Sequence, residues 1–433
     1  MKQHISWKKR GLTGLRFVAL SLLTGALCSS QTLGPHPRGI YAYSESLPQD
    51  SQPLMNALAV PGVDGVTLVF DWNQLEPQAG SFTLTLLDNW LSTAATSGKQ
   101  VALAIRAGQG TPCWLFQAPA CGASYSNTYA GATSYSFLVS PRGGNSENSC
   151  NSVTIAAPWD PVFLKEWDSL LANIAANLHS MGYYGTLTSL RLTGIDRTTT
   201  ELRLPAEILT SPPCEQNSNS IATWVGAGYR PHKLLEAWSA LTSSFLNHFP
   251  DKYFGVEIIP SDPHGTGLEP FPAIGEGGCV YAPPYTVSKS DPNYVPVKCV
   301  IDNEFSLMGL IPDMNAPLLS LASTRFAGRL SVAFQNLDLR FNANSYPVYA
   351  AQTWGTTIGY QTNDYDNFHR AACSGDYVTP GACTAATYLQ LLERGIYPLG
   401  KNNSLRAEYI EVLPPDAVAF PSAILAAHQE LTQ

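Results

Sequence analysis

Seven polar residues lie within or directly after short apolar runs, where most neighbouring side chains are aliphatic. Two carboxyl groups at such positions can perform general acid–base chemistry if one is protonated while the other is ionised. Arginine and amide side chains beside them can hold a carboxylate or donate hydrogen bonds to a polar ligand. The seven residues are Asp71, Arg106, Arg191, Glu257, Gln335, Gln352 and Glu411.

The apolar runs that carry these residues are typical of strands. They are short and rich in Val, Ile, Leu and Tyr, and most are separated by amphipathic stretches, which indicates parallel strands joined by crossover helices. The expected strands are Gly39–Tyr43, Val66–Phe70, Val101–Ile105, Ser189–Thr193, Tyr253–Ile259, Leu330–Gln335, Val348–Gln352 and Tyr409–Val412. Helices are expected at Leu84–Ser97, Val162–Met181, His232–Phe249, Thr384–Glu393 and Ala417–Leu431, from apolar residues at helical spacing.

Eight strands with intervening helices predict an α/β fold, a (β/α)8 TIM barrel that forms a single domain over residues 31–433. A doubly wound open sheet usually has a Gly-rich phosphate turn after its first strand, and this chain has none. If the bulky aliphatic residues of each strand face the helices, the polar residues between them face the barrel interior. In the last strand, Ile410 and Val412 then face outward and Glu411 inward.

A binding cavity explains the seven inward polar residues together, since their burial without partners would be costly. The alternative is a structural ion network in which Arg191 pairs with Glu257 or Glu411. Two long segments, Gly108–Pro158 and Ser261–Met314, follow strands and are expected on the C-terminal face, where barrel enzymes build their sites. Aromatic residues expected to face a ligand there are Trp72, Trp114, Trp354, Tyr281 and Tyr285, whereas Trp90, Trp167 and Trp238 are expected in the core.

The first thirty residues have the layout of a secretory signal peptide. Basic residues precede the apolar run Phe17–Leu27, and small residues follow at Cys28–Ser30. The run is shorter than the roughly 20 residues that span a bilayer. We therefore expect cleavage and export, extracellular or periplasmic, with no stable membrane span, rather than a retained anchor or a lipid at Cys28.

The other eight of the nine cysteines lie beyond this leader, and an even number in an exported chain implies disulfides. Spacing suggests Cys113–Cys121, Cys279–Cys299, Cys373–Cys383 and Cys150–Cys214, so that long C-terminal-face loops carry the disulfides. No CxxC or HxxxH spacing occurs, and neither a metal nor a cofactor is expected.

Charge and missing motifs exclude several functions. A net charge of −8 with 13% charged residues argues against nucleic-acid binding. The chain contains neither the GxSxG turn of α/β serine hydrolases nor the HExxH motif of zinc proteases. The sequence does not define an oligomeric state.

A motif around the second and third expected strands resembles a known group of enzymes. Gly65–Ser81 reads GVTLVFDWNQLEPQAGS, and Gly98–Ile105 (GKQVALAI) and Thr111–Leu115 (TPCWL) follow after a helix. A strand that ends near Trp and is followed by an LEP-type turn is similar to clan A glycoside hydrolases, retaining β-glycosidases with (β/α)8 barrels. The alternative to this resemblance is an ordinary strand-to-helix turn, as in any barrel. The resemblance implies a secreted enzyme that hydrolyses a β-linked poly- or oligosaccharide with paired carboxyl groups.

In that clan the general acid/base follows the fourth strand, and the resemblance therefore implies Glu201 in this role, with Asp196 in reserve. The clan's usual Asn-Glu pair is absent, because Thr200 precedes Glu201. The other carboxyl group of the clan, its nucleophile, ends the seventh strand.

The expected seventh strand of this chain ends in Gln352, and an amide cannot act as a nucleophile. Either another segment forms the seventh strand, or Glu257, and then Glu411, is the partner of Glu201, while Asp71 binds a sugar hydroxyl. A non-catalytic carbohydrate-binding barrel at the cell surface is the alternative, and Gln352 favours it.

Overall fold

The computed structural model describes residues 33–44, 47–117, 129–139, 151–197, 199–205, 208–209, 218–229, 231–258, 315–337, 346–362 and 383–433. Within Leu33–Gln433 the chain forms one compact unit. The expected signal peptide and the expected ligand-facing Tyr281 and Tyr285 lie outside the described residues.

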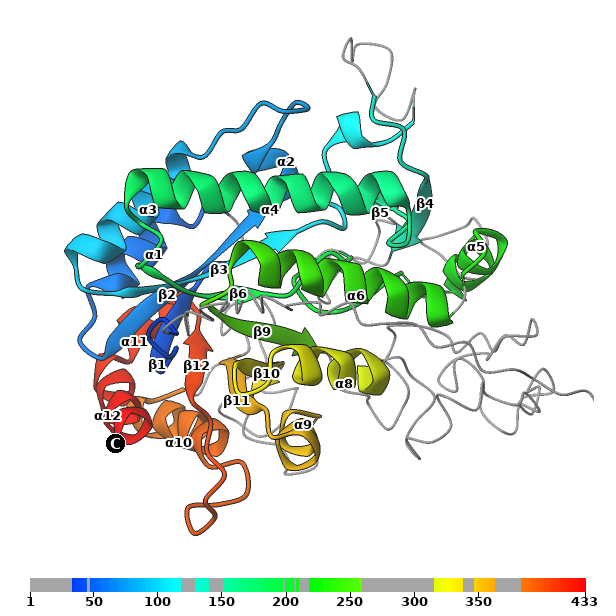
Figure 1. The fold of residues 1–433 in the computed structure, drawn as a ribbon. Helices are drawn as coiled ribbons and strands as arrows, with labels where there is room; N and C mark the ends of the chain where they lie inside the picture. Colours follow the sequence, from blue (N-terminus) through cyan, green and yellow to red (C-terminus); the bar gives the residue numbers. More distant parts are fainter. Residues whose placement is uncertain are drawn as a thin grey trace, which may run out of the picture. The chain divides into compact units, whose positions relative to one another are not determined.

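Eight parallel strands close into a barrel, which confirms the predicted fold (Figure 1). The last strand pairs with the first, and Glu411 lies opposite Tyr41 in that register. In order around the barrel the strands are β1 (Gly39–Tyr43), β2 (Val63–Asp71), β3 (Gln100–Arg106), β6 (Leu187–Arg191), β9 (Tyr253–Ile258), β10 (Leu330–Leu337), β11 (Thr357–Thr362) and β12 (Tyr409–Val412).

The expected seventh strand, Val348–Gln352, is wrong. These residues belong to helix α9 (Tyr346–Trp354), and β11 follows it. Gly355 ends the helix with φ 68°, and its N–H donates to the carbonyl of Ala351 at 3.0 Å. A left-handed glycine is a common helix stop, and a short apolar run cannot by itself distinguish a strand from a half-buried helix.

Helices cover the outside of the barrel, and α4 and α6 pack side by side (Figure 1). The side chain of Asp160 caps the start of α4 by accepting hydrogen bonds from the backbone of Val162 and Phe163. The outer helices are α1 (Ser51–Leu58), α3 (Thr85–Thr96), α4 (Pro161–Met181), α6 (Pro231–His248), α8 (Asn315–Arg325), α9, α10 (Ala385–Ile396), α11 (Pro414–Ala419) and α12 (Pro421–Thr432).

Three of the five expected helices agree closely with α3, α4 and α6. Expected helix Thr384–Glu393 becomes α10, which runs on to Ile396, with Thr384 as its N-cap. The expected closing helix is divided into α11 and α12 by Pro421 at the first position of α12, since proline cannot donate the hydrogen bond of a continuous helix. None of the helices in the described ranges combines the length and apolar character needed to cross a bilayer.

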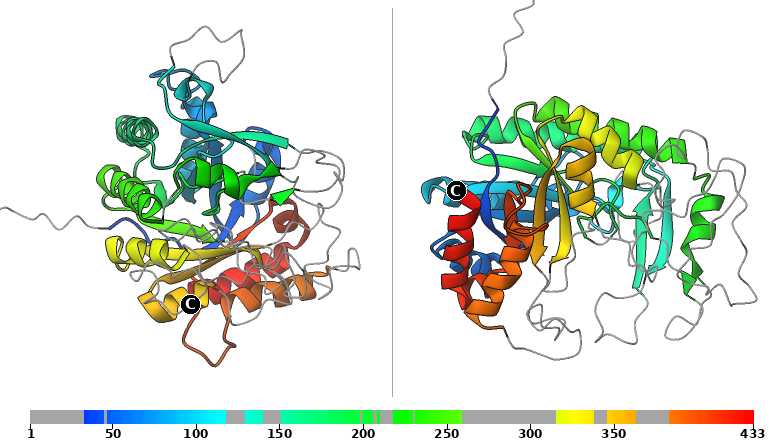
Figure 2. Two further views of the ribbon diagram at one scale, coloured as in Figure 1. Left: turned by 90° about the vertical axis from the view of Figure 1, so that its right-hand side faces the viewer. Right: turned by 90° about the horizontal axis from the view of Figure 1, so that it is seen from below.

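Short elements inserted between strands and helices lie toward the C-terminal ends of the strands. A hairpin of β4 (Ser134–Val139) and β5 (Asn151–Ala156) packs against α5 (Ser220–Gly226) (Figure 2). The Trp224 ring of α5 lies 4.5 Å from Phe137 of the hairpin, between ring centroids. The remaining short elements are α2 (Trp72–Leu75), the 3₁₀ turn η1 (Cys113–Leu115), β7 (Ile208–Leu209) and β8 (Ser218–Asn219).

The barrel interior contains an aromatic layer. Tyr41 and Tyr409 pack inside with Ala333, their rings 6.0 Å apart. Glycine is required beside both rings, because a Cβ at Gly65 would lie 2.6 Å from Tyr41 and one at Gly359 2.3 Å from Tyr409. Buried polar residues lie next to this aromatic layer, around the same small cavity.

Candidate active site

Arg191 bridges two carboxyl groups inside the barrel. It ends β6, and Glu257 and Glu411 each occupy the penultimate position of β9 and β12. Its Nη1 lies 2.8 Å from Glu257 Oε1, and its Nη2 donates to Glu411 Oε1 and Oε2 at 2.6 and 2.7 Å. All three side chains are buried. The inward orientation predicted from strand parity is therefore confirmed for these residues.

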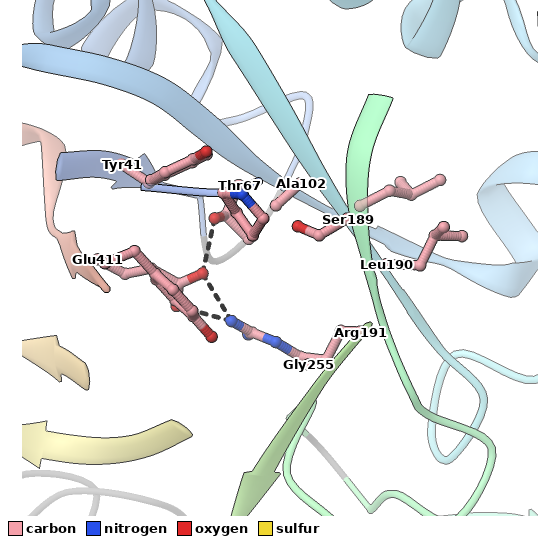
Figure 3. A pocket seen from close by; sticks show the side chains of 11 residues that line it. Tyr41, Thr67, Ala102, Ser189, Leu190, Arg191, Gly255 and Glu411 are labelled. Carbon is pink, nitrogen blue, oxygen red and sulfur yellow. Dashed lines mark hydrogen bonds and ion pairs between the residues drawn. The ribbon is translucent and has the colours of Figure 1, made fainter. Parts of the chain in front are cut away.

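Two threonine hydroxyls complete this network. Arg191 Nη1 donates to Thr200 Oγ1 at 3.0 Å, and Thr200 in turn donates to Glu257 Oε2. Thr67 of β2 donates to Glu411 Oε1 at 2.6 Å (Figure 3). A cavity of about 20 Å³ adjoins Thr67, Arg191 and Glu411, and this volume is sufficient for one water molecule.

Glu201 lies beside Glu257. The two residues form a parallel β-bridge, and Leu202 N–H donates to the Glu257 carbonyl at 2.9 Å. Bridged residues direct their side chains to the same face of a sheet. Glu201 is fully buried and contributes to the electrostatic field at Glu257. The loop after β6 thus extends the strand pairing and brings a third carboxyl group to the site.

The charge balance at this site favours a bound proton. Burial raises the pKa of Glu257, Arg191 opposes this shift, and the charges of Glu411 and Glu201 add to it. Glu257, Glu411 and Glu201 are all buried, and like charges held close together at low dielectric disfavour the ionisation of all three at once. The arrangement can hold one carboxyl group protonated beside an ionised one.

Asp196, the reserve acid/base candidate, acts as a connector between loops. Its carboxyl oxygens accept hydrogen bonds from the backbone N–H groups of Ala107, Gly108 and Gly194 at 2.9–3.2 Å. Burial raises the pKa of Asp196 to about 7, although these N–H groups oppose the shift. Asp196 therefore ties the loop after β3 to the loop after β6.

Asp71 and Arg106 form an ion pair at the C-terminal ends of β2 and β3. They lie opposite each other in the strand register, and Arg106 Nε donates to Asp71 Oδ1 at 2.6 Å. Both are partly exposed, and Asp71 lines an open cleft of about 630 Å³. The predicted position of these two residues at the top of the barrel is confirmed.

Several expected ligand-binding residues lie elsewhere. Gln352 is exposed on the outer helix α9, so it does not reach the barrel interior. Trp354 is on the same helix, half-buried, with its ring 5.6 Å from that of Tyr349. Gln335 lies in β10, but its side chain is outside the described residues.

The expected aromatic surfaces at Trp72 and Trp114 are also wrong, because both rings are buried. They pack edge to face with centroids 6.0 Å apart, and both indole N–H groups donate to Glu76. A tryptophan at a tight turn can point into the helix layer as readily as to the ligand. The expected core residues Trp90, Trp167 and Trp238 are indeed buried.

Gln361 lies near the end of the seventh strand of the barrel, where Gln352 was expected. It lies in the true seventh strand, β11, beside Glu411 in the register, and is buried. Its Oε1 has no hydrogen-bond partner among the described residues. The alternation in Thr357–Thr362, directly after a helix-ending glycine, is the signal that would have located this strand.

Two cysteines fall within the described ranges, and both are disulfide-bonded: Cys113 after β3 and Cys383 before α10. The other six expected partners lie outside those ranges, so the four pairings stay predictions. Within the described part of the chain, no three His, Cys, Asp or Glu side chains converge to form a potential metal site.

Comparison with known proteins supports the resemblance seen in the motif. Residues 44–120 match the family Glyco_hydro_42, described as beta-galactosidase. The match covers the turn after β2 and confirms the predicted similarity to glycoside hydrolases in this region. No curated protein matches the chain.

Solved structures of glycosidases have low overall similarity to the chain. An exo-beta-1,4-mannosidase from Opitutaceae bacterium strain TAV5 aligns over 91% of this chain with 11% identity and a TM-score of 0.42, and the chain spans 60% of that protein. An endo-glycoceramidase II from Rhodococcus sp. has 13% identity and a TM-score of 0.41, over 90% of this chain and 80% of that one. An intracellular xylanase from Thermoanaerobacterium saccharolyticum has 9% identity and a TM-score of 0.40, over 87% and 84%.

Proposed function

We propose that this protein is a secreted, retaining glycoside hydrolase that cleaves a β-linked poly- or oligosaccharide. The observation that carries the proposal is the pair Glu201 and Glu257, which lie side by side and buried, with Arg191 in contact with Glu257. The match of residues 44–120 to a family described as beta-galactosidase supports the reaction class and makes β-galactosides the first substrates to test.

The geometry favours retention of the anomeric configuration. Bridged strands lie about 4.7–4.9 Å apart, and retaining glycosidases place their carboxyl groups about 5–5.5 Å apart. Glu201 and Glu257 are bridged on one face, so their side chains are neighbours, and this is the basis for proposing a nucleophile and an acid rather than two groups separated by a water molecule.

Glu257 is the proposed acid, because its pKa is raised. It donates its proton to the glycosidic oxygen as the bond to the anomeric carbon breaks. Ionised Glu201 attacks that carbon and forms a glycosyl ester. Water then attacks the same carbon, Glu257 accepts the water's proton, and Glu201 leaves as a carboxylate. This exchanges the roles expected from the sequence, where Glu201 is the acid/base.

Arg191 and Glu411 position the reacting pair. Arg191 binds both oxygens of Glu411, and Thr67 of β2 donates a hydrogen bond to the same carboxyl group. The same guanidinium contacts Glu257 and fixes the orientation of its carboxyl group. Glu411 therefore stabilises Arg191 and does not itself contact the substrate.

Export is part of the proposal and rests on the N-terminal sequence. Cleavage is expected near Cys28–Ser30, with disulfides forming afterwards in an oxidising compartment. Expression of the full chain in a bacterial host, followed by fractionation and N-terminal sequencing, tests this. Full-length protein that remains in the cytoplasm would contradict it.

Hydrolysis is tested with aryl β-galactoside, β-mannoside, β-xyloside and β-glucoside substrates and with β-linked polysaccharides. Glu257→Gln is expected to lower kcat about 10²–10⁴-fold on substrates with poor leaving groups. Dinitrophenyl glycosides need little proton donation, so the same variant keeps most of its activity on them. Glu201→Gln loses activity on both classes.

The matched control is Glu236→Gln, on the exposed face of α6, which is expected to leave kcat unchanged. Retention is checked by following the anomeric protons of the first product by NMR. Full activity of both Glu201→Gln and Glu257→Gln, or an inverted first product, would contradict the proposed mechanism.

A non-catalytic carbohydrate-binding barrel is the second candidate. The complete burial of Glu201 and Glu257 favours it, because a substrate reaches these carboxyl groups only if covering atoms move. In that case the Arg191 network is structural, and every substrate in the panel remains intact while oligosaccharides still bind.

A further inference from the structure

We propose that the open cleft beside Asp71 binds a neutral sugar unit of an extended ligand, at a distance from the buried Arg191–Glu411 ion pair. The choice of a sugar rests on the proposed function. The cleft has a volume of about 630 Å³, within the range of about 300–1,000 Å³ that is typical of ligand sites. Its polar lining residues are Asp71, Asn73, Gln109, Thr111, Ser152 and Thr154.

The cleft has two walls from different parts of the chain. Asn73, in α2 after β2, and Gln109, after β3, belong to the barrel, whereas Ser152 and Thr154 belong to the β4–β5 hairpin. Ser152 and Thr154 alternate with buried Val153 and Ile155, so their side chains point away from the core. The hairpin thus presents a row of hydroxyls to the space above Asp71.

The barrel wall of the cleft is fixed before any ligand binds. Asp196 holds the backbone of Ala107 and Gly108, and Gln109 N–H donates to the Arg197 carbonyl at 2.7 Å. The two loops meet so closely that a Cβ at Gly108 would lie 2.1 Å from that carbonyl oxygen. A rigid wall lowers the entropy cost of ordering a ligand.

Charge favours a neutral ligand with many hydroxyls. Asp71 is the charged residue among those that line the cleft, and its Oδ1 is already paired with Arg106 at 2.6 Å. A phosphate or an acidic sugar would meet a carboxylate there, with no cation among the described lining residues. Amide and hydroxyl groups suit sugar hydroxyls, and Pro112 and Phe116 supply apolar surface for the C–H face of a ring.

The cleft is separated from the carboxyl cluster along one strand. Thr67 binds Glu411, and Asp71 lies four residues further along β2, about 13 Å at about 3.3 Å per residue. A single sugar ring in the cleft does not reach the Glu411 layer. A ligand that occupies both the cleft and the barrel interior must contain several sugar units, so we expect the cleft to add affinity for tetrasaccharides or longer chains rather than for monosaccharide derivatives.

Calorimetry on the full protein carrying Glu257→Gln tests this without turnover. The probes are β-linked galacto-, manno-, xylo- and cello-tetraose, the corresponding monosaccharides and an acidic tetragalacturonide. At least one neutral tetrasaccharide is expected to bind, and Asn73→Ala or Thr154→Ala is expected to raise its Kd about 3- to 10-fold by removing one hydrogen bond.

Matched controls separate the cleft from general effects. Thr154 Oγ1 lies 3.0 Å from Ser136 Oγ. Ser136→Ala therefore removes the same hydroxyl–hydroxyl contact as Thr154→Ala but keeps the Thr154 hydroxyl in the cleft. The tetrasaccharide Kd of Ser136→Ala is expected to equal that of the protein carrying Glu257→Gln alone. Asn89→Ala, at an exposed position of α3, controls for Asn73→Ala.

The outcomes of the two proposals are distinguishable. Neutral tetrasaccharide binding that depends on Asn73 and Thr154, without hydrolysis by the wild type, would reject the proposed catalysis and support the cleft. Hydrolysis with unchanged tetrasaccharide Kd in both cleft variants would reject the cleft. Preferential binding of the tetragalacturonide, or no tetrasaccharide binding at all, would also overturn it.

Discussion

At the scale of single residues, Arg191 binds two buried carboxyl groups inside the barrel. Its guanidinium contacts Glu257 and Glu411 and donates to Thr200, and all of these groups are buried. A buried ion network of this kind contributes little net stability compared with apolar packing, but loss of one partner leaves an uncompensated charge. Orientation of the carboxyl groups is therefore the more useful consequence of the network.

Replacement of Arg191 tests its role in folding. Arg191→Met is expected to lower the free energy of unfolding by about 3–5 kcal/mol, because it leaves two buried carboxyl groups without their cation. Urea unfolding measures this loss. Lys401→Met, at an exposed ion pair with Glu393, is the control and is expected to cause no measurable change. An Arg191 variant as stable as the wild type would contradict the charge balance described above.

Thr200 provides a test of the proposed acid. Its hydroxyl donates to Glu257 and lowers the pKa of that group, so Thr200→Val is expected to raise the pKa further. The acid must be protonated, so activity falls as the pH rises through its pKa. The alkaline limb of kcat/KM should therefore move to higher pH in Thr200→Val.

The pH profile of Thr93→Val, which changes a partly exposed threonine of α3, serves as the reference. An unmoved alkaline limb in Thr200→Val, or one displaced to lower pH, would exclude Glu257 as the acid.

At the scale of elements, connections between loops position both the site and the cleft. Asp196 links the loops after β3 and β6, and the loop after β6 continues to Glu201, which pairs with β9. Gln109 and Thr111 on the loop after β3 line the cleft. The same buried carboxyl group thus supports the segments that carry the proposed nucleophile and one cleft wall.

The raised pKa of Asp196 has a consequence for stability. A carboxyl group whose pKa rises to about 7 on folding stabilises the protein most when the pH is below the pKa of that group in the unfolded chain. This contribution is lost as the pH rises through about 7. The measured quantity is the unfolding free energy of the wild type minus that of Asp196→Asn. This difference is expected to fall by on the order of 2–4 kcal/mol between about pH 4 and pH 7. Chemical unfolding of both proteins across this range measures it, and a difference that grows with pH would contradict the argument.

At the scale of the whole molecule, the barrel places an aromatic layer next to buried charged residues. Tyr41 and Tyr409 fill the interior next to glycines, and Arg191, Glu257 and Glu411 lie near the C-terminal ends of their own strands. The fold therefore encloses its charged side chains within the barrel, whereas the cleft is lined by the loops that follow the strands.

The packing of the aromatic layer can be tested at Gly359. Gly359→Ala is expected to lower the free energy of unfolding by about 1–3 kcal/mol, because its Cβ would lie 2.3 Å from the Tyr409 ring. Thermal and urea unfolding report the loss. Gly185→Ala, which has no atom within 4 Å of the added carbon, should be nearly neutral. Equal stability of the two variants would show that the barrel interior has more room than described.

Local patterns in the sequence were sufficient for most of the barrel. Alternating apolar runs located seven of the eight strands, because strand formation on a helix-covered sheet selects aliphatic residues over short segments. The inward direction of Arg191, Glu257 and Glu411 followed from the two-residue period of a strand. The motif around the turn after β2 correctly indicated similarity to glycoside hydrolases.

Tertiary structure alone decided which of these residues meet. Val348–Gln352 satisfies a strand pattern but forms a helix, and Trp72 enters the packing beneath a turn instead of facing a ligand. The Glu201–Glu257 bridge and the hydrogen bonds of Asp196 join segments far apart in the chain. Sequence periodicity reports the environment of one segment, whereas these contacts depend on the closure of the barrel and the paths of its loops.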